Sequence, residues 1–123
     1  MKTLIIIGGF YCLAFFIFHL FFWKLFDWKH DLSFLTEINR GVIQILNLCL
    51  MFVFLVIAYV SLFYTDELLT SSLGKILLVG ISIFCLLRAV EQVVFFGLKS
   101  TVSIVFFITF LLGSTIYMIP LLG

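Results

Sequence analysis

Charged residues are scarce in this chain of 123 residues, which has seven Lys or Arg and six Asp or Glu, 11% of the sequence. Soluble domains carry about 25% charged residues, so the usual solvated surface is missing. The net charge of +1 also leaves no basic surface of the kind that nucleic-acid binding needs. The composition therefore excludes an ordinary soluble domain and predicts that nucleic acid is not a partner.

Proline and paired cysteines are rare as well. The single proline, Pro120, leaves nearly the whole chain free to form uninterrupted helices. Three cysteines, Cys12, Cys49 and Cys85, all fall within apolar stretches and have no metal-type spacing. We interpret them as packing residues, because an odd number of cysteines in such positions does not form a disulfide framework. Since no phosphate-binding, nucleophile or zinc motif is present either, we expect no metal and no cofactor.

What the chain has in abundance is apolar surface: 65% of its residues are hydrophobic, 17 of them Phe. Four apolar segments cover residues 3–23, 41–64, 76–98 and 101–122. Each reaches the ~20 residues that a helix needs to cross a bilayer, and none alternates in the manner of barrel strands. The sequence predicts an all-α integral membrane protein: a four-transmembrane-helix antiparallel bundle, one membrane domain over 1–123, with both termini on the same side.

The ends of these segments also indicate an orientation. The first segment is longer than the 7–15-residue core of a signal peptide, and we expect it to be a retained span. The first and third connections lie on one side of the membrane and carry four basic residues near the span ends, namely Lys24, Lys29, Arg40 and Lys99. The N-terminus and the second connection lie on the other side and carry two, Lys2 and Lys75. By the positive-inside rule this predicts a multi-pass protein of a cytoplasmic or inner membrane, with both termini outside.

The third apolar segment carries three polar residues, Arg88, Glu91 and Gln92, at spacing i, i+3, i+4. This spacing places them on one face of a helix. Ionisable groups inside a membrane are costly and are candidates for functional sites. The alternative is an internal Arg–Glu pair that neutralises itself and fixes the helix against its neighbours.

Polar residues also begin the second segment, where Arg40, Gln44 and Asn47 form one stripe at spacing i, i+4, i+7. They could belong to a binding site. Alternatively, Arg40 is an interfacial anchor, and the two amides are interhelical hydrogen-bond partners worth about 1 kcal/mol each. The first segment adds His19, one turn before Trp23.

Topology brings these three sets together. The first and third segments end, and the second begins, on the same face of the membrane, so their polar residues share one leaflet. We therefore predict one polar cavity or network with seven binding residues: Arg88, Glu91, Gln92, Gln44, Asn47, Arg40 and His19.

Three functions are compatible with this pattern. The first is a module that binds or transports an ion, a small polar solute or a lipid head group. The second is a non-catalytic subunit, assembly factor or scaffold of a larger membrane complex. The third is a membrane-embedded enzyme that handles lipids or thiols, for which the sequence offers no nucleophile. The expected partners are the lipid bilayer and a homo-oligomer or larger complex.

Overall fold

A computed structural model describes residues 2–122, which are almost entirely helical and contain no strand. Four helices are long and apolar enough to cross a membrane: α1 (Lys2–Leu20), α4 (Glu37–Phe63), α6 (Ser72–Phe96) and α7 (Thr101–Leu122). The shorter elements are α2 (Phe22–Leu25), α3 (Trp28–Asp31), η1 (Leu32–Phe34) and α5 (Thr65–Thr70). The predicted all-helical class and the four apolar helices are confirmed.

Hydroxyl side chains cap the starts of the long helices. Thr36 accepts a hydrogen bond from the backbone N–H of Asn39 at 3.3 Å, and Ser71 accepts one from Gly74 at 2.9 Å. Such caps satisfy backbone donors that a helix start leaves free. They explain why α4 and α6 each begin four residues earlier than the apolar segments predict: hydropathy registers the lipid-soluble core of a helix, not its polar first turn.

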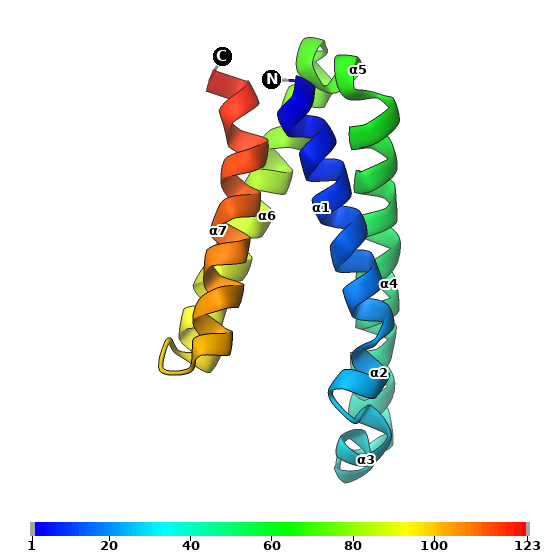
Figure 1. Ribbon diagram of the computed structural model, residues 1–123. Coiled ribbons are helices and arrows are strands. Elements are labelled where there is room, and N and C mark those ends of the chain that lie inside the picture. The colour runs from blue at the N-terminus through cyan, green and yellow to red at the C-terminus, as the bar shows by residue number, and fades with distance from the viewer. Residues whose placement is uncertain (1, 123) are drawn as a thin grey trace.

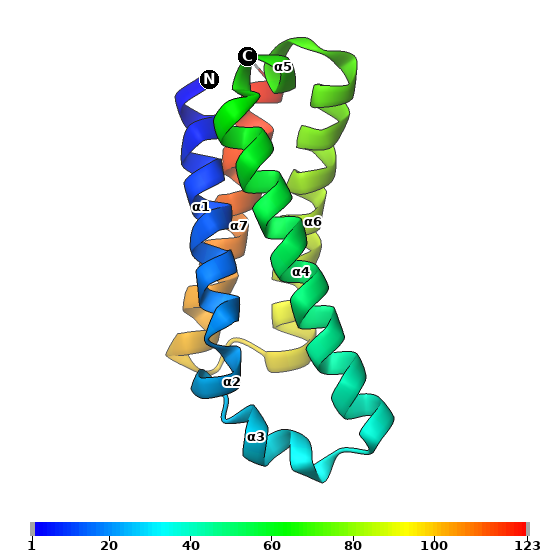
Figure 2. The ribbon, with the colours of Figure 1, turned by 90° about the vertical axis from the view of Figure 1, so that its right-hand side faces the viewer.

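The long helices form two pairs, α1 with α4 and α6 with α7, and α1 also packs against α7. Successive long helices run in alternate directions (Figures 1 and 2). The two pairs diverge along their length, away from α5 (Figure 1). We call the end with α5, the start of α1 and the end of α7 the closed end. The end with α2, α3 and the turn at residues 97–100 is the open end.

Glycines allow α1 and α7 to approach each other at the closed end. A Cβ atom on Gly8 would lie 2.6 Å from the Tyr117 ring, and one on Gly113 would collide with the Tyr11 side chain. Each helix thus uses a glycine to accept a tyrosine of the other. Close approach through small residues is a common way for apolar helices to pack.

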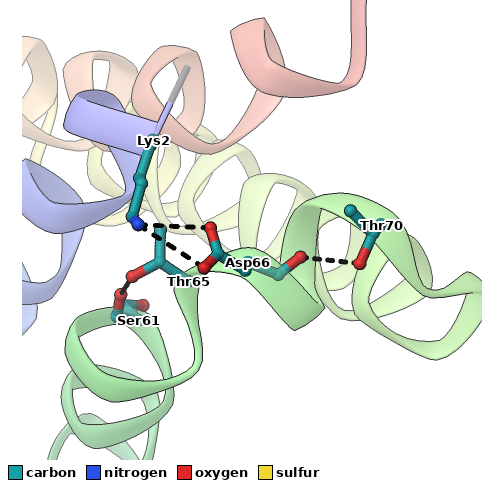
Figure 3. Close-up of polar contacts among 5 residues, drawn as sticks. All are labelled: Lys2, Ser61, Thr65, Asp66 and Thr70. Atoms are coloured by element: carbon teal, nitrogen blue, oxygen red, sulfur yellow. Dashed lines mark hydrogen bonds and ion pairs between the residues drawn. The ribbon is translucent and has the colours of Figure 1, made fainter.

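The short helix α5 joins the two pairs at the closed end. Lys2 and Asp66 form an exposed ion pair of 3.3 Å, which links the start of α1 to α5 (Figure 3). The Thr65 hydroxyl donates to the carbonyl of Ser61, and the Thr70 hydroxyl donates to that of Asp66 (Figure 3). Gly74 lets the start of α6 rest directly on the α5 backbone at Leu68.

Most of the apolar surface of the long helices faces outward. In the most apolar window of each helix only 22–28% of residues are buried inside the molecule. Phe52 and Phe95, for example, are 68% and 78% exposed. Monomeric soluble proteins rarely expose contiguous apolar surface of this extent.

Candidate ligand-binding cleft

A cleft of about 550 Å³ lies between the two helix pairs. One wall comes from α1 and α4 and carries Phe15, His19 and Phe54; the other comes from α6 and α7 and carries Arg88 and Phe110. Most of the lining residues are aromatic, and Phe15 stacks on Phe110 with ring centroids 5.6 Å apart. The helix pairs that meet at the closed end separate toward the open end (Figure 1), and the cleft lies between side chains of the two pairs.

Arg88 is the only Lys or Arg that lines the cleft within the described residues. Its guanidinium carbon lies 4.6 Å from the centroid of the Phe110 ring, a cation–π contact. The side chain is half-buried, and it stands eight residues, or about 12 Å, before the end of α6. Lys2–Asp66 is the only ion pair among residues 2–122, so no carboxylate of that range lies within ion-pair distance of Arg88.

Glu91 does not share the position of Arg88. Its side chain is exposed on the outer face of α6, where Val90 and Val94 are also exposed. Positions separated by three residues differ by about 60° around a helix axis, enough to separate a cleft wall from the outer surface. The internal Arg–Glu pair that the spacing allowed is therefore not formed between the described side chains.

His19 is held in the cleft by Asn47. The Asn47 amide nitrogen donates to the His19 carbonyl at 3.3 Å, which directs the amide oxygen to His19 Nδ1 at 2.7 Å. Because that oxygen can only accept, Nδ1 carries a proton, and in the neutral ring Nε2 is left with a lone pair. His19 also contacts the rings of Phe22 and Phe54.

Gln92 lies on the α6 wall and links it to α7. Its amide nitrogen donates to the Ser103 hydroxyl at 2.9 Å, and that hydroxyl donates to the Gly97 carbonyl. Gly97 adopts a φ of 68°, a conformation that favours glycine where α6 ends. Gln92 thus fixes the turn that brings α7 back along α6.

Arg40 and Gln44 do not line the cleft but border a smaller pocket of about 250 Å³. Arg40 donates to the carbonyls of Leu32 and Leu35, and Gln44 accepts from the Trp23 indole at 3.0 Å. These bonds hold the α2–α3–η1 segment against the start of α4. The seven predicted site residues therefore form separate groups instead of one hydrogen-bonded network: three line the cleft, one orients His19, two border the second pocket and one faces outward.

Several cleft residues were not singled out by sequence reasoning, namely Tyr11, Trp28, Ser103 and Phe110. In a chain with 17 Phe, one more aromatic residue carries no signal of a site. Ser103 could have been noticed as a polar residue in the first turn of the fourth apolar segment.

No three His, Cys, Asp or Glu side chains within residues 2–122 are arranged to hold a metal ion. Comparisons with protein families, with curated proteins and with solved structures each give no match to this chain.

Proposed function

We propose that this protein spans a membrane four times and binds a small amphipathic molecule in the cleft between its helix pairs. The carrying observation is the cleft itself, which is lined by aromatic rings and yet contains Arg88. Its volume of about 550 Å³ falls within the range of about 300–1,000 Å³ typical of small-molecule sites. Such sites combine apolar walls with a few polar groups that orient the ligand.

Among the ligands that the sequence allowed, the aromatic walls favour a lipid-like molecule over a free ion. An ion pathway needs polar groups along its length, whereas the polar groups here are confined to a few positions between Phe side chains. The exposed apolar faces of the four long helices support insertion as an antiparallel bundle.

The binding test is native mass spectrometry of protein purified from its host membrane in a mild detergent. We expect one retained amphipathic molecule per chain. Leu50→Trp, which fills the cleft, should abolish retention. Leu48→Trp is the matched control, because Leu48 is an exposed residue of the same helix outside the cleft. A wild-type protein that retains no ligand, and that no single-chain amphiphile stabilises against heat, would show the proposal to be wrong.

The orientation is tested by labelling single cysteines placed at Lys29 and Asp66 with a membrane-impermeant thiol reagent in intact cells. The proposal puts both termini outside, so position 66 should react and position 29 should not. The unsubstituted chain, whose own cysteines lie in the apolar helices, is the background control. Labelling at position 29 and not at position 66 would show that the protein has the opposite orientation.

A second candidate function is that of a non-catalytic subunit of a larger membrane complex. Glu91 favours it, since a carboxylate on an apolar outer helix face can pair with a basic residue of a partner helix. The complex should then survive mild-detergent purification and be lost in Glu91→Gln. Recovery of the wild type as a lone monomer would exclude this role.

A further inference from the structure

The cleft holds one positive charge, that of Arg88, and no carboxylate in the described part of the chain forms an ion pair with it. Arg88 makes neither an ion pair nor a side-chain hydrogen bond with another residue in the range 2–122, and its guanidinium instead stacks on the face of Phe110. Among the described residues no side-chain nitrogen or oxygen is both buried and without a partner, so the guanidinium nitrogens of Arg88 are accessible. Because Arg88 lines the cleft, a molecule bound there can supply an acceptor.

A guanidinium at this depth selects the chemistry of its acceptor. Arginine presents a planar set of donors that matches the two oxygens of a carboxylate or phosphate. The surrounding rings exclude water, and a charge-assisted hydrogen bond is stronger in such a site than at the surface. The opposite wall adds no Lys or Arg among the described residues, and His19 on that wall donates from Nδ1 to Asn47 and, in its neutral form, keeps a lone pair on Nε2. The charge complementarity thus indicates a ligand with one anionic group.

The rest of the ligand follows from the walls and the volume. Beyond Arg88 the cleft is lined by aromatic rings from both helix pairs, including Phe15, Phe54 and Phe84. A volume of about 550 Å³ holds roughly 18 water-sized groups at about 30 Å³ each. This is about the size of one alkyl chain with its head group.

We propose that the ligand of the cleft is a single-chain anionic amphiphile, a carboxylate or a phosphate monoester on one alkyl chain, with Arg88 as the residue that binds its anionic group. This inference rests on the proposed binding function and assigns its ligand class. Arg88 sets the preference for anionic over neutral amphiphiles, and the aromatic walls hold the chain.

The experiment uses the full chain in a neutral maltoside detergent at pH 8.5, and the signal is the fluorescence of Trp28, which lines the cleft, together with that of Trp23, whose ring centroid lies 5.2 Å from it. The probe is stearate with a nitroxide spin label on its chain, which quenches tryptophan fluorescence, and the comparison is its neutral methyl ester. We expect the acid to bind at least tenfold more tightly than the ester. Arg88→Gln should remove that difference, whereas Arg88→Lys should retain part of it.

Lys75→Gln is the matched control, because it removes an exposed positive charge at the closed end. It should leave the tenfold preference unchanged, which shows that net charge alone does not produce it. Competition separates the sources of the anion: hexadecanoate or hexadecyl phosphate should displace the probe, and inorganic phosphate should not. Displacement by inorganic phosphate at the same concentration as hexadecyl phosphate would overturn the amphiphile assignment.

The failures of the two proposals differ. Saturable and equal quenching by the acid and the ester would overturn the anionic ligand while leaving the binding function in place. The absence of saturable quenching by either probe would overturn both. An Arg88→Gln protein that keeps its helical content and elutes as the wild type, yet keeps the tenfold preference, would remove Arg88 from the site.

Discussion

The two helix pairs pack against each other at the closed end of the molecule and separate toward the open end (Figure 1). At the closed end Gly8 and Gly113 let α1 and α7 touch, and the Tyr117 hydroxyl bonds to Ser61 at 3.0 Å. Toward the open end aromatic side chains line the cleft between the pairs, and Arg88 has no ion pair with any residue in 2–122. Small residues and hydrogen-bonded polar groups allow the helices to pack closely at one end. Large aromatic rings and an arginine without an ion pair line the cleft toward the other end.

This contrast is sharpest for glycine substitutions. Gly113→Leu should destabilise the protein by roughly 3 kcal/mol or more, because the added side chain overlaps Tyr11 and the helices must separate. The measurement is the apparent melting temperature in detergent, followed by circular dichroism. Gly80→Leu is the control, since a Cβ there meets no atom within 4 Å. Equal melting of the two variants would show that the closed end is not tightly packed.

Substitution of Arg88, in the cleft toward the open end, should change stability in the opposite direction. Arg88→Leu is expected to raise the apparent melting temperature of the ligand-free protein, because replacing a cation inside an apolar region recovers roughly 2 kcal/mol. The same substitution should abolish binding of anionic amphiphiles, a trade of function for stability. A clear loss of stability would instead assign Arg88 a structural role, and Lys75→Leu controls for the change in charge.

The Tyr117 hydroxyl provides an intermediate test of the closed end. It lies 3.0 Å from Ser61 Oγ and 3.5 Å from Cys12 Sγ, and Tyr117 is fully buried. Tyr117→Phe should cost about 1 kcal/mol, the usual net value of one hydrogen bond. Tyr59→Phe, at a 54% exposed position, should leave the melting temperature unchanged. If both variants melt as the wild type does, the buried hydroxyls do not stabilise the joint.

The Lys2–Asp66 ion pair should matter least. Both side chains are well exposed, so the pair contributes at most about 1 kcal/mol and is weakened by salt. Asp66→Asn should shift the melting temperature by no more than a degree or two at moderate ionic strength. A larger loss that persists in high salt would mean that α5 depends on Asp66 for more than this pair.

Much of the fold could be predicted because hydropathy depends on local composition. The fourth segment was expected at 101–122 and α7 spans Thr101–Leu122, while the polar caps at Thr36 and Ser71 extend α4 and α6 beyond their apolar segments. Residues 24–40, which hold most of the α2–α3–η1 segment, fall outside the four predicted apolar segments. Its short helices depend on contacts such as Arg40 with the Leu32 carbonyl, which spacing does not reveal.

The candidate site was harder to predict because it depends on the rotation of each helix. Spacing grouped Arg88 with Gln92, and the structure places both in the lining of the cleft; it also grouped Glu91 with them, and Glu91 faces outward. Topology placed His19 and Asn47 in one leaflet, and the structure joins them by hydrogen bonds. Topology could not show that Gln44 and Arg40, predicted in the same leaflet, border another pocket.

The sequence by itself determined the helical class, the four apolar helices and the small set of polar residues within them, since these follow from composition and from runs of about 20 residues. Only the tertiary structure decided that α1 packs on α7 through Gly8 and Gly113, and that the helix pairs diverge to leave Arg88 in a cleft. The physical reason is that hydropathy acts along one helix, whereas rotation and divergence are set by the shapes of side chains that meet between helices.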